Sequence, residues 1–147
     1  MGGRLTDGTD ISAPNRGWGL LLLRFLVGWV FLSEGIQKFL FPAALGAGRF
    51  EKIGIPAPQF MGPFVGATEI VCGTFLILGL FTIFAVWPLL TVILVAITTT
   101  KAPLLLKQGF WAVMHEGRTD FCMIVGLLAI ALLGAGPFSL DRRRHGE

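Results

Sequence analysis

Polar side chains that could exchange protons or bind a polar ligand stand inside apolar stretches of this chain. The segment SEGIQKFLF, residues 33–41, ends a long apolar run and carries Glu34, Gln37 and Lys38 in its last two helical turns. Glu34 and Lys38 are four residues apart, the spacing that favours an ion pair on one helix. A second acid, Glu69, interrupts another apolar run and has no basic residue three or four positions away. Its partner therefore comes from another helix, or the carboxyl is protonated or hydrated.

More polar residues are expected at the same end of the molecule. Three threonines and Lys101 end the third apolar run, and Asp120 begins the fourth. Ionisable groups at membrane depth are costly, and they are found mainly where they pair with one another or serve a function. We therefore predict Glu69 as a catalytic proton donor or acceptor. The predicted ligand-binding residues are Glu34, Gln37, Lys38, Thr99, Lys101 and Asp120.

Two interpretations of this cluster stay open. The residues could form a clamp that holds the helices in register, or they could line a pocket for a polar head with an apolar tail, such as a quinone. If Glu34, Lys38 and Glu69 share one pocket, either a second cation such as Lys101 joins them or one carboxyl stays protonated near neutral pH. The pocket would lie beneath the segments 41–60 and 101–118.

A separate charge, Arg24, stands alone near the other end of the first apolar run. The nearest acid by topology is Asp141, in GPFSLD after the last apolar run. If this segment folds back under the helices, Asp141 and helix-end carbonyl groups would hold Arg24. We predict a structural role for this pair and for Ser139, which lies in the same segment.

The elements that position these residues follow from composition. The chain of 147 residues is 54% hydrophobic and 14% charged, against about 25% charged residues in soluble domains. Four apolar segments, at about 17–40, 61–80, 82–100 and 119–137, each approach the ~20 residues that span a bilayer. We predict an all-α membrane protein, an antiparallel bundle of four transmembrane helices in one domain (17–138). The flanking segments, 1–16 and 139–147, would be a disordered polar tail and a basic tail.

Two long connections and two pairs of glycines indicate how the predicted bundle is arranged. The connections 41–60 and 101–118 are apolar enough to be interfacial or re-entrant loops on the face opposite the termini. The first helix carries one pair of glycines and the second another, each pair seven residues apart and therefore on one helical face: Gly28 and Gly35, then Gly66 and Gly73. Small residues let membrane helices approach closely, so we expect these two helices to be in contact.

Other features limit the choice of partners and cofactors. Cys72 and Cys122 lack the spacing of a metal site or a redox pair. Three consecutive arginines, 142–144, indicate a solvated tail without a specific partner or a segment that anionic lipid attracts, rather than nucleic-acid binding. These arginines directly follow the last helix, so the termini are expected to be cytoplasmic. The helices hold no haem-ligand histidine pair, iron–sulfur cysteine set or dinucleotide-binding glycines. A redox cofactor would therefore be carried by a partner protein.

Three motifs carry a resemblance to a known family. RFLVGWVFLSEGIQKF (24–39), EIVCGTFLILGL (69–80) and GAGPFSLD (134–141), in this order and spacing, resemble the DoxX family of small four-helix membrane proteins. Glu34 and Cys72 fall outside the family pattern and look specific to this chain. The positions that the resemblance implies as family positions are Arg24, Gly28, Phe31, Gly35, Lys38, Glu69, Gly73, Gly79, Ser139, Leu140 and Asp141.

The resemblance also implies a function. Family members are linked to oxidoreductase assemblies of the bacterial plasma membrane, including the small subunit of thiosulfate:quinone oxidoreductase and a mycobacterial redox-defence complex. The implied function is a membrane subunit of a quinone-linked complex, bound to other subunits or to copies of itself, with no covalent cofactor. The alternatives are a non-catalytic assembly subunit and a small-solute transporter. The last is less favoured, because the chain has no inverted repeat and no paired helix breaks.

Overall fold

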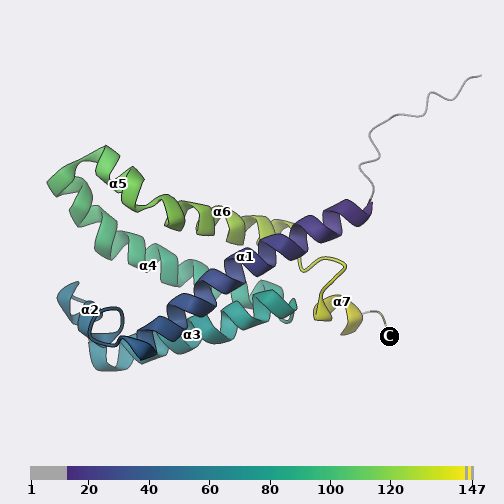
Figure 1. Cartoon of the computed structure of the whole chain (residues 1–147), viewed down its shortest axis with the longest axis horizontal. Helices are drawn as coiled ribbons and strands as arrows, with labels where there is room; N and C mark the ends of the chain where they lie inside the picture. The colour runs from purple at the N-terminus through teal and green to yellow at the C-terminus, as the bar shows by residue number, and fades with distance from the viewer. Residues whose placement is uncertain (1–12, 145, 147) are drawn as a thin grey trace, which may run out of the picture.

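Every regular element in the described part of the chain is a helix, as predicted (Figure 1). The computed structural model describes residues 13–144 and residue 146. The helices are α1 (Ala13–Leu40), α2 (Ala47–Lys52), α3 (Pro58–Leu78), α4 (Thr82–Gln108), α5 (Phe110–Glu116), α6 (Arg118–Leu133) and α7 (Leu140–Arg144). Most of the predicted disordered tail, residues 1–12, lies outside the described residues, and α1 already includes residues 13–16. The predicted basic tail contains α7.

Three helices among the described residues, α1, α3 and α4, are long and apolar enough to cross a membrane. The predicted fourth span, 119–137, corresponds to α6. This helix has 16 residues, about 24 Å at 1.5 Å per residue, and a bilayer core is about 30 Å thick. Gly134 and Gly136 adopt positive φ angles of 78° and 81° and end the helix early. The predicted boundary at residue 137 was therefore wrong.

The boundary of the third span also differs from the prediction. The α4 helix continues through Lys101 and Pro103 to Gln108, although the sequence favoured an end near residue 100. A proline inside a helix removes one backbone hydrogen bond, here to the carbonyl of residue 99, and the helix tolerates that loss. Two short helices, α2 and α5, occupy the predicted connections 41–60 and 101–118.

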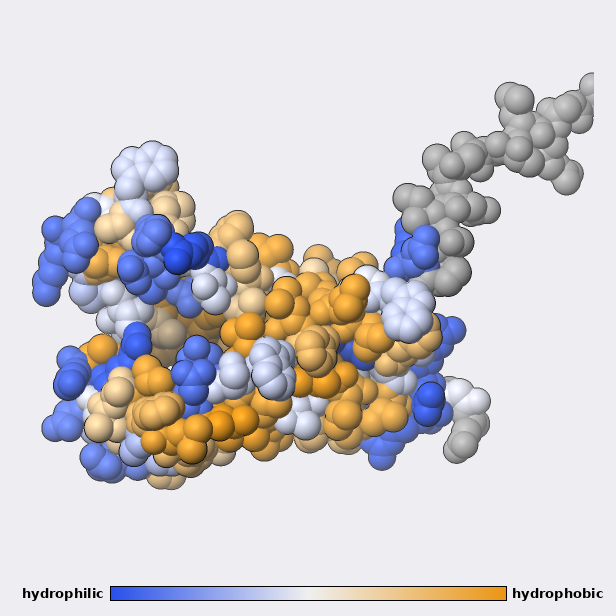
Figure 2. All heavy atoms as spheres, in the orientation of Figure 1, coloured by the Kyte–Doolittle hydropathy of each residue, from blue (hydrophilic) through white to orange (hydrophobic). Residues whose placement is uncertain are grey.

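The helices pack around a compact apolar core. Neighbouring pairs are α1 with α3, α3 with α4, α4 with α6, and α6 with α1. Residues from all four helices are fully buried between them: Val27, Leu76, Leu89, Leu127 and Ile130. The face of the molecule seen in Figure 2 is apolar along its middle, and hydrophilic residues gather at both ends. This pattern is typical of a protein whose flanks contact lipid.

The predicted close contact between the first two spans is confirmed. A methyl group built on Gly28 would lie 2.7 Å from the Gly73 carbonyl oxygen, and one on Gly35 would lie 2.6 Å from that of Gly66. Both distances are shorter than a real contact, so no side chain fits between the two backbones. The four glycines therefore set the distance between α1 and α3.

Candidate functional site

A buried ion pair joins α1 to α3 near the end that carries α2. The Nζ atom of Lys38 lies 2.7 Å from Oε2 of Glu69, and the two side chains are 11% and 5% exposed. Lys38 belongs to the last turn of α1, and Glu69 lies in the middle of α3. The partner of Glu69 thus comes from another helix, one of the three alternatives that the sequence left open.

Glu34 extends this pair to the surface of the helix bundle. Its carboxylate lies 3.9 Å from Lys38 Nζ on the same helix, and its side chain is 53% exposed. Lys38 stands between one buried acid and one exposed acid, and it lies closer to the buried one. Gln37 is half-buried and makes no side-chain hydrogen bond to any described residue. We call Glu34, Lys38 and Glu69 the acid–lysine cluster.

Two of the other predicted site residues form a separate group between α4 and α6. Lys101 Nζ lies 3.6 Å from Asp120 Oδ2 and donates a hydrogen bond to the carbonyl of Glu116 at 3.1 Å. Lys101 therefore does not supply a second cation to the acid–lysine cluster. Thr99 donates its hydroxyl hydrogen to the Val95 carbonyl of its own helix. The expected single cluster is divided in two by the structure.

The Lys101–Asp120 pair is expected to add little stability. The two side chains are 17% and 27% exposed, and a partly hydrated pair contributes less than about 1 kcal/mol. Asp120→Asn should lower the free energy of unfolding by no more than this amount, measured by thermal unfolding in mild detergent. A loss as large as that of a buried ion pair would contradict this assignment.

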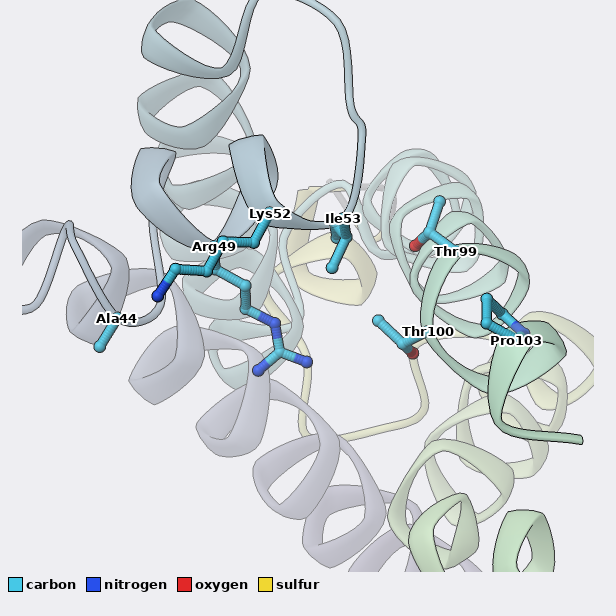
Figure 3. Close-up of a pocket in the computed structure, with 7 residues that line it drawn as sticks. All are labelled: Ala44, Arg49, Lys52, Ile53, Thr99, Thr100 and Pro103. Atoms are coloured by element: carbon cyan, nitrogen blue, oxygen red, sulfur yellow. The ribbon is translucent and has the colours of Figure 1, made fainter. Parts of the chain in front are cut away.

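A cavity of about 540 Å³ opens between α2 and α4 at the same end of the molecule (Figure 3). Figure 2 shows the hollow there, between two groups of hydrophilic residues. Its lining consists of Ala44, Arg49, Lys52, Ile53, Thr99, Thr100 and Pro103. Sequence reasoning missed Arg49 and Lys52, although two cations within the largely apolar connection 41–60 were the available sign. The acid–lysine cluster does not line this cavity.

The opposite end of the molecule holds the predicted structural residues. Arg24 is 1% exposed and donates hydrogen bonds to the carbonyls of Ala135 and Phe138, in the segment that follows α6. Asp141 interacts electrostatically with this guanidinium. Ser139 is buried and closes a turn by donating to the Gly136 carbonyl at 2.7 Å. We call residues 134–144 the C-terminal strap.

Asp141 also attaches the strap to the start of α4. Its two carboxylate oxygens accept hydrogen bonds from the backbone N–H groups of Phe81 and Thr82, at 2.8 and 2.9 Å. These N–H groups have no partner within the helix. The Asp141 N–H in turn donates to the Gly79 carbonyl. The strap is thereby tied both to α1, through Arg24, and to the turn between α3 and α4.

Apolar helical spans with charges buried between them define this molecule as a small helical membrane protein. The DoxX family model matches residues 19–102, more than half of the chain. The chain therefore belongs to the DoxX family, as its three motifs predicted.

Two relatives support this assignment. The chain is 49% identical over 130 residues to an uncharacterized membrane protein of Mycobacterium tuberculosis, an alignment that covers 84% of this chain and 80% of the relative. It is 34% identical over 125 residues to a Bacillus subtilis protein named "Putative oxidoreductase CatD", covering 84% of each chain. No solved structure matches the chain at a significant level.

Proposed function

We propose that this DoxX protein is a membrane subunit of a quinone-linked redox complex, and that the acid–lysine cluster exchanges protons with the quinone. The gradient of exposure along the cluster carries the proposal. The exposed fraction of the side chain falls from 53% at Glu34 to 11% at Lys38 and 5% at Glu69. The Nζ atom of Lys38 lies 3.9 Å from the Glu34 carboxylate and 2.7 Å from the Glu69 carboxylate. Such a series leads from the exposed surface of α1 to a buried carboxylate.

The chemistry of a quinone suits this arrangement. Reduction to the quinol takes up two electrons and two protons, and a partner subunit would supply the electrons from its own cofactor. A quinone head arriving from the bilayer would meet Glu34 first. Lys38 would donate a hydrogen bond to a quinone carbonyl. Glu34 and Glu69 would each take up a proton from water and pass it to a quinone oxygen, which accounts for the two protons of the quinol. The name of the Bacillus relative is consistent with an oxidoreductase association.

The second candidate function is a non-catalytic assembly subunit. The 2.7 Å contact between Lys38 and Glu69 favours it, because a buried ion pair between α1 and α3 also works as a clamp. In this case, the exposed apolar flanks would dock other membrane subunits or further copies of the chain. A transporter is the least supported alternative.

The membrane arrangement belongs to the same proposal. We place the protein in the bacterial plasma membrane with four crossings, the fourth formed by α6 together with the first residues of the strap. Both termini would be cytoplasmic, because Arg142, Arg143 and Arg144 follow the last crossing and anionic lipid attracts such clusters. The cavity and the acid–lysine cluster would then face the opposite leaflet.

Glu69→Gln is expected to separate the two candidate functions. Glutamine keeps the volume of the side chain and can still bind Lys38, but it cannot release a proton. The variant should insert and fold with reduced stability, because Lys38 loses its buried counter-charge. The quinone reductase activity of the folded complex, purified in mild detergent, should fall about a hundredfold or more, the lower end of the range for loss of a proton-transfer group.

Asp120→Asn is the matched control for this experiment. It also neutralises one carboxylate that faces a lysine, but outside the acid–lysine cluster. It should leave the activity unchanged. Full activity of Glu69→Gln in a folded complex would remove the cluster from proton transfer and would support the assembly role instead.

A further inference from the structure

The cavity between α2 and α4 is lined by two cations. Arg49 and Lys52 line it from α2, and no acidic residue is part of its lining. Within the described residues, neither cation forms an ion pair. Glu51 lies between them in the sequence and is not part of the lining. In Figure 3 the guanidinium group of Arg49 extends from α2 toward Thr100 of α4. The cavity is therefore suited to an anion.

The opposite wall offers hydrogen-bond acceptors. The Thr99 hydroxyl donates to the Val95 carbonyl at 2.7 Å, and the Thr100 hydroxyl donates to the Ala96 carbonyl at 2.6 Å. Each hydroxyl has a single hydrogen, which is already used, so its remaining capacity is to accept. A ligand that fits both walls carries an anionic group for the cations and hydroxyl groups for the threonines.

The cavity also lies at a boundary between polar and apolar surface. Thr99 and Thr100 are polar, and the preceding turn of α4 exposes Leu94 and Val95. Ile53, Ala44 and Pro103 contribute apolar contacts to the lining. A molecule bound here can place a charged head between α2 and α4 and run an apolar tail along the outside of α4. A free anion would make no use of this apolar surface.

We propose that the cavity binds the headgroup of an anionic phospholipid with free hydroxyl groups, such as phosphatidylglycerol. The phosphodiester oxygens accept hydrogen bonds from the Arg49 guanidinium, whose geometry matches phosphate, and from the Lys52 ammonium. The headgroup hydroxyls donate to Thr99 and Thr100. The bound lipid bridges α2 to α4. This site is separate from the acid–lysine cluster, and its occupancy does not depend on the proposed redox role.

The test is lipid binding by the full-length protein in mild detergent. Native mass spectrometry would measure the affinity for phosphatidylglycerol and for zwitterionic phosphatidylcholine, and thermal unfolding would be followed with each lipid and with inorganic phosphate. The variants are Arg49→Gln, Lys52→Gln and their combination. Lys107→Gln is the matched control, because it removes an exposed cation of α4 that does not line the cavity. Circular dichroism confirms that each variant is folded.

We expect wild type to prefer phosphatidylglycerol and to be stabilised by it. Each single substitution should weaken this binding about tenfold, typical for the loss of one charge-assisted hydrogen bond, and Lys107→Gln should not. Equal affinity for the two lipids, or unchanged binding by the folded double variant, would overturn the proposal. Stabilisation by inorganic phosphate equal to that by the lipid would show a free-anion site and would also overturn it. This test measures lipid binding and not quinone reductase activity. The lipid site and the proposed redox role can therefore each fail without the other.

Discussion

Replacement of Arg24 by alanine is expected to release the C-terminal strap and to lower the free energy of unfolding by about 3 kcal/mol, the cost of removing one partner from a buried charged network. The guanidinium is buried and donates hydrogen bonds to the carbonyls of Ala135 and Phe138. Both carbonyls lose this donor in the variant. Asp141 also loses a neighbouring cation. Thermal unfolding in mild detergent measures the loss, and trypsin cleavage after the arginines of α7 reports release of the strap.

The control for this substitution is Arg16→Ala, which removes an exposed arginine from the same helix. It should change neither stability nor cleavage. Asp141→Ala should also destabilise, because the N–H groups of Phe81 and Thr82 lose their acceptor. The double variant Arg24→Ala, Asp141→Ala should be no worse than either single variant, because both residues hold the same strap. Fully additive losses would show that they act independently.

Gly35→Ala should cost about 1–3 kcal/mol, the usual range when extra atoms enter a packed interface. The new methyl group would lie 2.6 Å from the Gly66 carbonyl oxygen and 2.9 Å from the backbone nitrogen of Ile70. Because backbone atoms cannot move aside as a flexible side chain can, α1 and α3 must separate. Separation would also lengthen the contact between Lys38 and Glu69, which lies beside this interface.

Gly19→Ala, on the same helix, is the matched control. A methyl group on Gly19 has no atom within 4 Å, and alanine is the better helix former by roughly 0.5–1 kcal/mol. This variant should be neutral or slightly more stable. The comparison is made by thermal unfolding of the two variants in the same detergent. Equal stability of Gly35→Ala and Gly19→Ala would exclude the close backbone contact between α1 and α3.

The sequence by itself determined the helical class and much of the packing between α1 and α3. Long apolar runs in a bilayer must satisfy their backbone hydrogen bonds internally, so they form helices. Glycines seven residues apart fall on one helical face, and this periodicity predicted the contact of Gly28 and Gly35 with α3. Glu69 has no basic residue three or four positions away in its own helix. The sequence therefore indicated that an ion-pair partner of Glu69 would come from another helix.

Only the tertiary structure decided which charges meet. Lys38 could have paired with Glu34 by its spacing of four residues, yet it lies closer to Glu69 of the adjacent helix. Lys101 instead faces Asp120. Spacing along the chain fixes neighbours within one helix, whereas pairs between helices depend on the rotation and depth of each helix, which local preferences leave undetermined. The cavity lined by Arg49 and Lys52 likewise depends on how the helices are placed relative to one another. Its two walls come from α2 and α4, which come together only after the helices have packed.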